Sequence, residues 1–169
     1  MKKLVSYLFA TTLIIIASPV MSGELPSPTG PVLLTVSGNI QRSNNNGVAE
    51  FDREMLLALT QRTISTENPW NDGINTYSGP LGEAIMDAVG VKGTVITVTA
   101  LNDYSADLPT SDLSEFGVIF AMSMNDKELR VRDRGPLFVI YPFTGRPELN
   151  SERYHNRSVW QINRIVVNE

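Results

Sequence analysis

Residues 130–142 read Arg130-Val-Arg-Asp-Arg-Gly-Pro-Leu-Phe-Val-Ile-Tyr-Pro142 and carry most of the information about the fold. The apolar run from Leu137 to Tyr141 predicts a strand, and Pro142 ends it because proline cannot donate a ladder hydrogen bond. A second stretch, Ala100-Leu-Asn-Asp-Tyr104, closes another predicted strand. The chain contains no cysteine. The two stretches therefore predict two strand ends, and the chain offers no thiol that could bind a metal.

The N-terminus is typical of an export signal. Two lysines precede the apolar run Leu4–Ala17, and small residues precede Gly23. The run is short for a membrane span, which favours a signal peptide of residues 1–22, cleaved near Ser22 and Gly23, over a retained anchor. We therefore expect an exported protein that resides in the periplasm.

The rest of the chain is expected to form one domain. Residues 23–31 are rich in Pro, Ser and Gly and predict a flexible tether, which leaves residues 32–169 for the domain. Removing the two signal lysines from the 14 basic residues leaves 12 against 18 acidic ones. This net charge of −6 argues against a nucleic-acid partner. A single histidine, His155, expected at the surface, and the missing cysteines argue against a zinc site, and we predict no metal site.

The predicted elements combine a few helices with strands that come mostly late in the chain. Asp52 is a good N-cap for a first helix, and Pro80 starts a second helix that Gly90 ends. Residues 111–116 favour a short third helix, residues 63–66 are open to a strand, and residues 68–73 predict no regular structure. The strands are Val32–Ser37, Val95–Leu101, Val118–Met122, Glu128–Arg132, Leu137–Tyr141 and Val159–Val167. Because turns join most of them, we expect an α+β fold with mixed or antiparallel sheets and two or three helices.

Five pieces of sequence, in their order and spacing, resemble a known family. They are the Gly79-Pro80-Leu81 helix start, the Asn102-Asp103-Tyr104 strand end, the Ala121–Leu129 hairpin, the strand from Gly135-Pro136-Leu137 to Tyr141-Pro142, and the closing Trp160–Val167 strand. Across nearly the whole mature chain, this pattern is similar to the molybdopterin-binding domain of the sulfite oxidase family. The resemblance implies the molybdopterin-binding-like fold of that family.

One departure from the family changes the function that the resemblance implies. Sulfite-oxidase-type enzymes hold molybdenum through a cysteine thiolate after the first helix, and residues 63–70 of this chain hold none. The chain looks more like the solitary, cysteine-free periplasmic members, such as pterin-binding regulators of the PruR type. Their implied role is to bind a free reduced pterin, with no tightly bound cofactor, and to signal to the periplasmic domain of an inner-membrane protein. That partner would carry a GGDEF or EAL domain, which makes or degrades cyclic di-GMP.

Five residues are candidates for contact with the flat pterin ring. The 2-amino-4-oxo edge of the ring pairs well with a carboxylate or an amide, so Asp103 and Asn102 are candidate partners. Trp70, Tyr104 or Trp160 could stack on the ring face. Each has a simpler interpretation: Asp103 could only shape the turn after its strand, and both tryptophans could belong to the core.

Three further residues are candidates for contact with the ligand periphery. Arg132 and Arg134 alternate with Arg130 along a predicted strand. They could bind a phosphate or the pterin side chain, pair with Asp133 and other acidic neighbours, or share a solvated face. Tyr141 could contact the ligand or be a buried strand residue with a satisfied hydroxyl.

No catalytic residues are predicted. With one histidine and no cysteine, a nucleophilic triad would have to use His155, and the sequence has no Gly-x-Ser-x-Gly motif. We therefore expect a pterin-binding protein that is not an enzyme. The alternatives are a molybdopterin-dependent oxidoreductase with an unusual metal contact and a ligand-free protein-interaction module.

Overall fold

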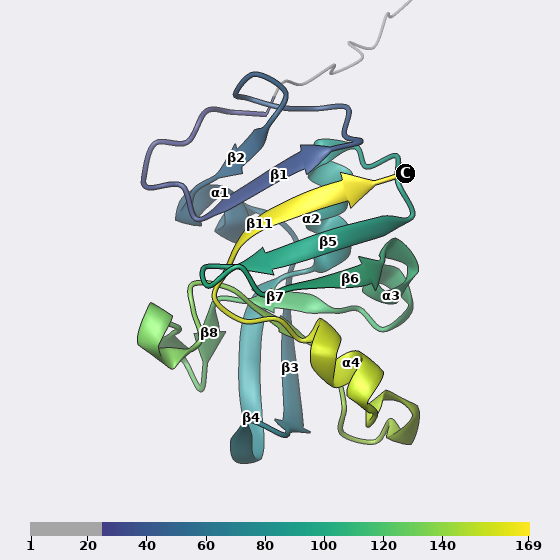
Figure 1. Ribbon diagram of the computed structural model, residues 1–169. Coiled ribbons are helices and arrows are strands. Elements are labelled where there is room, and N and C mark those ends of the chain that lie inside the picture. The colour runs from purple at the N-terminus through teal and green to yellow at the C-terminus, as the bar shows by residue number, and fades with distance from the viewer. Residues whose placement is uncertain (1–24) are drawn as a thin grey trace, which may run out of the picture.

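A five-stranded mixed sheet forms the centre of the computed structural model, which describes residues 25–169 (Figure 1). The predicted signal peptide, residues 1–22, lies outside the described residues. The central strands β1 and β11 run parallel, and every other pair in this sheet is antiparallel. In spatial order, the strands are β2 (Ala49–Phe51), β1 (Leu34–Gly38), β11 (Ile162–Asn168), β5 (Val95–Ala100) and β6 (Ser105–Pro109).

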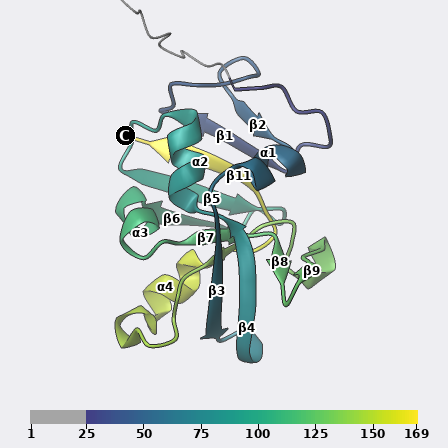
Figure 2. The ribbon, with the colours of Figure 1, turned by 180° about the vertical axis from the view of Figure 1, so that it is seen from behind.

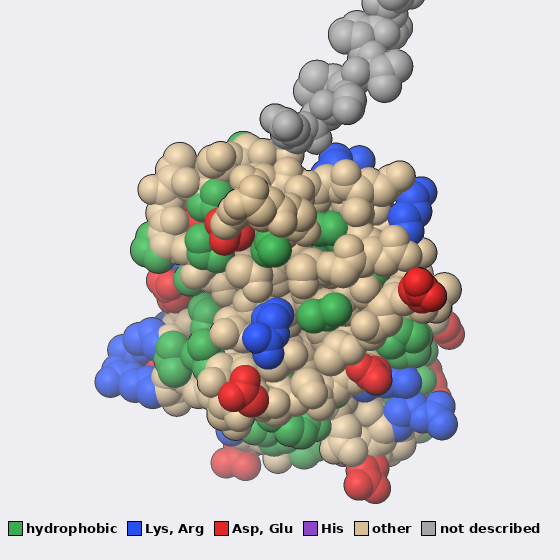
Figure 3. All heavy atoms as spheres, turned by 45° about the horizontal axis from the view of Figure 1, so that its top comes forward, with side chains coloured by type: hydrophobic (Ala, Val, Ile, Leu, Met, Phe, Trp, Pro, Cys, Tyr) green, Lys and Arg blue, Asp and Glu red, His purple; other side chains and the backbone are tan. Residues whose placement is uncertain are grey.

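Helices cover one face of this sheet. The helices α1 (Arg53–Ala58) and α2 (Gly82–Val89) lie behind the sheet in Figure 1 and in front of it in Figure 2, and α3 (Thr110–Glu115) packs beside α2. Leu56, Ile85 and Leu113 on these helices are buried in the core below the sheet. On the face seen in Figure 3, hydrophobic side chains are scattered among polar ones and form no single large patch.

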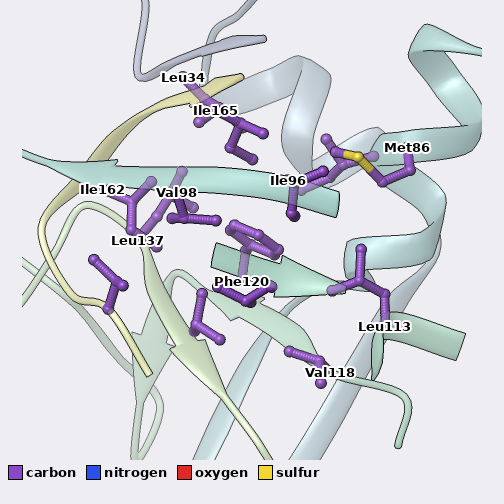
Figure 4. Packing of buried hydrophobic residues seen from close by; sticks show 14 of the residues in the cluster. Leu34, Met86, Ile96, Val98, Leu113, Val118, Phe120, Leu137, Ile162 and Ile165 are labelled. Atoms are coloured by element: carbon purple, nitrogen blue, oxygen red, sulfur yellow. The ribbon is translucent and has the colours of Figure 1, made fainter. Parts of the chain in front are cut away.

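Two short strands divide the interior into two hydrophobic clusters. The strand β7 (Ile119–Ala121) pairs antiparallel with β10 (Phe138–Ile140). Phe120 faces the large cluster under the five-stranded sheet (Figure 4), whereas Ile119 and Phe138 face a smaller second cluster. Because both faces of these strands are buried, their sequence is continuously apolar.

A long hairpin forms two strands of a second, four-stranded sheet, and the sequence predicted only part of this sheet. Its strands β3 (Gln61–Asn68) and β4 (Asn71–Pro80) are joined at Pro69 and Trp70 and are followed in the sheet by β8 (Ser123–Met124) and β9 (Lys127–Glu128). The prediction of no regular structure over residues 68–73 is therefore wrong for most of them. These strands are rich in Thr, Ser and Asn, and pairs such as Thr63 and Ser78 bond through their hydroxyls at 2.8 Å, so little apolar alternation marks them.

Two further elements differ from the prediction. The helix α4 (Glu152–Arg157) is a fourth α-helix where two or three were expected, and it has no buried residue, so it lacks apolar periodicity. The predicted strand Glu128–Arg132 ends at Glu128, and Val131–Asp133 form a 3₁₀ helix, as do Pro147–Leu149. Arg130, Arg132 and Arg134 therefore do not alternate along a strand.

The predicted α+β class with mixed and antiparallel sheets is confirmed, and so are two helix boundaries. Asp52 caps α1 by accepting a hydrogen bond from the backbone N–H of Met55 at 2.9 Å. Gly90 ends α2 with a left-handed φ of 63°. Pro80, in contrast, is the last residue of β4 and Leu81 takes the N-cap position of α2. Within residues 25–169, no helix is both long and apolar enough to cross a membrane.

Candidate functional site

A hollow of about 320 Å³ brings together residues from four separate parts of the chain. We call it the first hollow. Its lining comes from the β3–β4 turn, the end of β5 with the turn after it, the helix α4 with the residues that follow, and the residue two positions before β11. Its lining residues are Trp70, Ala100, Asn102, Tyr104, His155, Asn156, Ser158 and Trp160.

Two tryptophans form the aromatic wall of the first hollow. The rings of Trp70 and Trp160 meet edge to face, with centroids 5.7 Å apart and an interplanar angle of 65°. Trp70 also meets the ring of His155 at 6.0 Å and that of Phe138 at 5.6 Å. Both tryptophans are partly exposed, so each ring packs on the second cluster with one part and faces the hollow with another. This geometry holds two aromatic rings at a fixed, steep angle to each other beside the hollow.

Arg134 holds this wall in place. Its guanidinium donates to the carbonyl oxygen of Trp70 and to Asn71 Oδ1, both at 2.9 Å, and lies 5.9 Å from the Trp160 ring centroid. All these contacts are to protein groups, and Arg134 is not among the residues that line the hollow. Arg134 therefore positions the tryptophans instead of touching the hollow itself.

The opposite side of the first hollow is polar. Tyr104 is 48% exposed, and its hydroxyl donates to the carbonyl oxygen of Asn156 at 3.1 Å. Asn102 Oδ1 accepts from the backbone N–H of Tyr104 at 3.2 Å, so the amide group of Asn102 keeps its two N–H donors free. The side chain of Asn156 has no hydrogen-bond partner within residues 25–169. The wall thus offers two amides beside an aromatic surface.

Asp103 does not line the hollow. It occupies the left-handed region at φ 63°, and its backbone N–H donates to the carbonyl oxygen of Ala100 at 3.0 Å. Its side chain is 92% exposed, with Oδ1 3.9 Å from Arg164 Nη2. The structure therefore supports the turn interpretation of Asp103, because a tight turn after β5 points this carboxylate into solvent.

Arg132 and Tyr141 also lie away from the hollow. The Arg132 side chain is 70% exposed on the 3₁₀ helix and lies 3.8 Å from Asp133. Tyr141 is completely buried, and its hydroxyl donates to Asp112 Oδ2 at 2.9 Å. Burial and the neighbouring carboxylate raise the pKa of Tyr141. Neither side chain lines the first hollow: Tyr141 is a core residue with a satisfied hydroxyl, and Arg132 is exposed.

Three lining residues come from α4 and the residues after it, and sequence reasoning missed them. His155, expected at the surface, has its Nε2 atom buried without a hydrogen-bond partner among the described residues. Asn156 and Ser158 follow it. An ion pair fixes this helix, because Arg157 Nη1 donates to the buried Asp112 carboxylate at 2.8 Å. The short polar helix carries no apolar pattern, so only its place in the fold reveals these residues.

Comparison with known proteins adds support for the fold and none for a specific activity. No known family profile matches the sequence, and no curated protein matches it. The structure is similar to the crystal structure of the sulfane dehydrogenase SoxCD from Paracoccus pantotrophus, with a TM-score of 0.61 and 18% sequence identity. The match covers 86% of this chain and 40% of that one, so this chain spans less than half of the length of that protein. At this identity the likeness shows the fold alone, a molybdopterin-binding-like α+β fold.

Proposed function

We propose that this protein binds a free reduced pterin in the first hollow and does not act as an enzyme. One observation carries the proposal: Trp70, Trp160 and Tyr104 line the same hollow as two asparagine amides. A pterin has a flat face for an aromatic ring and an edge of N–H and C=O groups for an amide, whose oxygen accepts and whose nitrogen donates. The molybdopterin-binding-like fold is consistent with a ligand of this class.

The contacts available predict moderate affinity. Stacking of a heterocycle on one aromatic side chain contributes about 1–3 kcal/mol, and each neutral hydrogen bond contributes about 0.5–1.5 kcal/mol. One stack with three such bonds, from Asn102, Asn156 and Ser158, falls short of the about 8 kcal/mol that a micromolar dissociation constant requires. Without the Asp103 carboxylate these contacts sum to about 2.5–7.5 kcal/mol, and the upper part of this range corresponds to a dissociation constant on the order of 10–100 µM.

The donor groups of this chain do not fit a thiolate-bound molybdenum. The sequence has no cysteine, and the end of β3 offers Thr66 and Glu67 instead. Hard oxygen donors bind a different class of metal from a soft thiolate. Residues 25–169 also hold no group of three or more His, Asp or Glu residues placed to bind a metal ion. These side chains therefore support binding of a pterin that carries no metal.

The proposed biological role is regulatory. By its resemblance to pterin-binding regulators, we propose that the protein acts in the periplasm on an inner-membrane protein with a GGDEF or EAL domain. Tyr104, which lines the first hollow, and Leu101, which precedes the lining residue Asn102, are 48% exposed each, so they are available for contact with a partner. Co-purification of such a membrane protein with the chain, only when reduced pterin is added, would support this role. Equal recovery with and without pterin would contradict it.

Intrinsic fluorescence offers a direct test of binding. The sequence contains two tryptophans, and both Trp70 and Trp160 line the first hollow, so all tryptophan emission comes from the proposed site. We expect tetrahydrobiopterin to quench this emission to a plateau at tens of micromolar, after correction with free N-acetyltryptophanamide for light absorbed by the pterin. Calorimetry should give the same dissociation constant. No saturable change up to about 1 mM would refute the proposal.

A matched pair of variants tests the polar side of the site. Asn102→Ala removes an amide at the hollow and is expected to raise the dissociation constant about three- to tenfold, which corresponds to one lost hydrogen bond. Asn39→Ala removes an amide from an exposed position outside the hollow and should leave binding unchanged. Equal affinities for the two variants would remove Asn102 from the ligand contacts.

A further inference from the structure

A second hollow of about 500 Å³ shares one wall with the first. His155 lines both hollows, and its ring packs against Trp70 of the first and Phe143 of the second. The rest of the second hollow comes from the end of β3 and from the loop between β10 and α4. The site proposed for the pterin ring does not use this space.

The frame of the second hollow is tied down by hydrogen bonds. Thr144 Oγ1 accepts from the backbone N–H of Glu67 at 2.9 Å, and the backbone N–H of Thr144 donates to Thr66 Oγ1 at 3.0 Å. Asn68 Nδ2 donates to the Tyr77 hydroxyl at 2.7 Å. The loop is therefore joined to β3 by paired polar groups.

Several other polar groups that line the hollow, in contrast, have no hydrogen-bond partner in residues 25–169. The carboxylate of Glu67 and the side-chain amide of Asn150 make no hydrogen bond or ion pair with any residue in 25–169. The Arg146 guanidinium lies 5.7 Å from the Phe116 ring centroid and has no carboxylate partner in the described chain. The buried Nε2 of His155 is also unpaired there. Residues with unpaired donors and acceptors thus line one space, together with Phe143 and Pro147 as apolar surface.

These groups select for a neutral, hydroxylated ligand. Glu67 repels an anion that Arg146 attracts, and Arg146 repels a cation that Glu67 attracts, so the two charges together give little net preference for a ligand charge of either sign. A hydroxyl both donates and accepts, so neighbouring hydroxyls satisfy a carboxylate, which only accepts, and a guanidinium, which only donates. The Asn150 amide does both, and the C–H groups of a polyol can lie against Phe143 and Pro147.

We propose that the second hollow binds a vicinal diol on a short carbon chain or sugar ring. Two sources carry this chemistry: a hydroxylated substituent on the ring ligand of the first hollow, reaching past His155, or a free polyol. If the diol belongs to the ring ligand of the first hollow, the inference rests on the proposed function. If the diol belongs to a free polyol, the inference is independent of that function.

Ligand pairs that differ only in the substituent test the first source. Tetrahydroneopterin, which carries a trihydroxypropyl chain, is expected to bind about tenfold more tightly than 6-methyltetrahydropterin. Glu67→Gln and Asn150→Ala should reduce this advantage to under about threefold and leave binding of the methyl compound unchanged. Glu148→Gln, on the same loop but outside the hollow, is the control and should keep the full advantage.

Free polyols test the second source. Glycerol or ribose, added to the ¹⁵N-labelled protein, would shift the amide resonances of Gly145 and Asn150 saturably, and Glu67→Gln would abolish the shift. Inorganic phosphate should not displace the polyol. If neither pterin binds, the proposed function fails and the polyol titration alone decides the inference. Equal affinity for the two pterins together with no saturable polyol shift would overturn it.

Discussion

At the scale of single residues, Asp52 shows how one carboxylate ties several segments together. Its Oδ1 caps α1, and its Oδ2 accepts from the backbone N–H groups of Thr29 and Gly30 at 2.7 and 2.9 Å. The hydrogen bonds from Met55, Gly30 and Thr29 lower the pKa of Asp52 to about 2. The N-terminal segment is thereby joined to the first helix.

Acid should weaken this link. The folded pKa of about 2 lies below the unfolded value of about 3.9, so the ionised form stabilises the fold fully above about pH 4 and progressively less as the pH falls toward 2. We expect Asp52→Asn to lower the thermal midpoint at pH 7 and to lower it less at pH 3. The exposed Asp72→Asn serves as control and should change neither. A midpoint difference for Asp52→Asn that is equal at both pH values would contradict the assignment.

Substitution of Tyr141 distinguishes a role in stability from a role in ligand binding. Tyr141→Phe removes the hydrogen bond to Asp112 but leaves Asp112 paired with Arg157, so we expect a loss of about 1.5–3 kcal/mol in the free energy of unfolding. Because the ring is completely buried, the pterin dissociation constant should stay within about twofold of wild type. Denaturant titration and fluorescence quenching measure the two effects, and weaker binding without lost stability would reverse the assignment.

At the scale of elements, α4 depends on its anchor. The helix has six residues and none of them is fully buried, so its packing on the core depends on the half-buried rings of Tyr154 and His155 and on the ion pair of Arg157. Its ion pair to Asp112 is well shielded, with side-chain exposures of 19% for Arg157 and 8% for Asp112. The position of His155 and Asn156 at the first hollow therefore depends on a residue of α3.

Loss of this anchor should disturb stability and binding together. We expect Asp112→Ala to cost about 3–5 kcal/mol, because it leaves Arg157 and the Tyr141 hydroxyl without their acceptor. Hydrogen exchange at residues 152–158 should rise, and pterin affinity should fall. Glu115→Ala, an exposed position on the same helix, is the matched control. Unchanged exchange in α4 for Asp112→Ala would show that something else holds the helix.

The predictability of the elements follows their contacts. Val95–Val98 alternate between half-buried and buried positions within a predicted strand, since the pleat places alternate side chains in the core. The β3–β4 hairpin and α4 carry mostly polar residues, and their conformation comes from pairing and docking onto distant elements. Local periodicity therefore predicted the strand at Val95–Ala100 and did not predict the β3–β4 hairpin or α4.

At the scale of the whole molecule, the two hydrophobic clusters meet along β7 and β10. Phe120 on one face and Ile119 on the other are both completely buried. Phe138 in the second cluster lies 5.6 Å from the Trp70 ring centroid and 6.1 Å from that of Trp160, so the core supports the wall of the first hollow directly. We expect the two clusters to unfold as one unit.

Truncating the centre of the core tests this coupling. Phe120→Ala is expected to lower the free energy of unfolding by about 3–5 kcal/mol and to keep a single transition. Tryptophan emission, which reports on the hollow, and far-ultraviolet circular dichroism should give the same denaturation midpoint. Separate midpoints would show that the hairpin and its cluster unfold independently of the five-stranded sheet.

The amino-acid sequence by itself determined the α+β class, the strands rich in β-branched residues, and the helix limits at Asp52 and Gly90. These follow from side-chain periodicity and backbone preferences, which act over a few residues. Only the tertiary structure decided which side chains share a hollow. It brought Trp70 and Trp160 together with Asn102 and His155, sent Asp103 into solvent and buried Tyr141. Such contacts join residues tens of positions apart, and they depend on how sheets and helices pack, which no local pattern encodes.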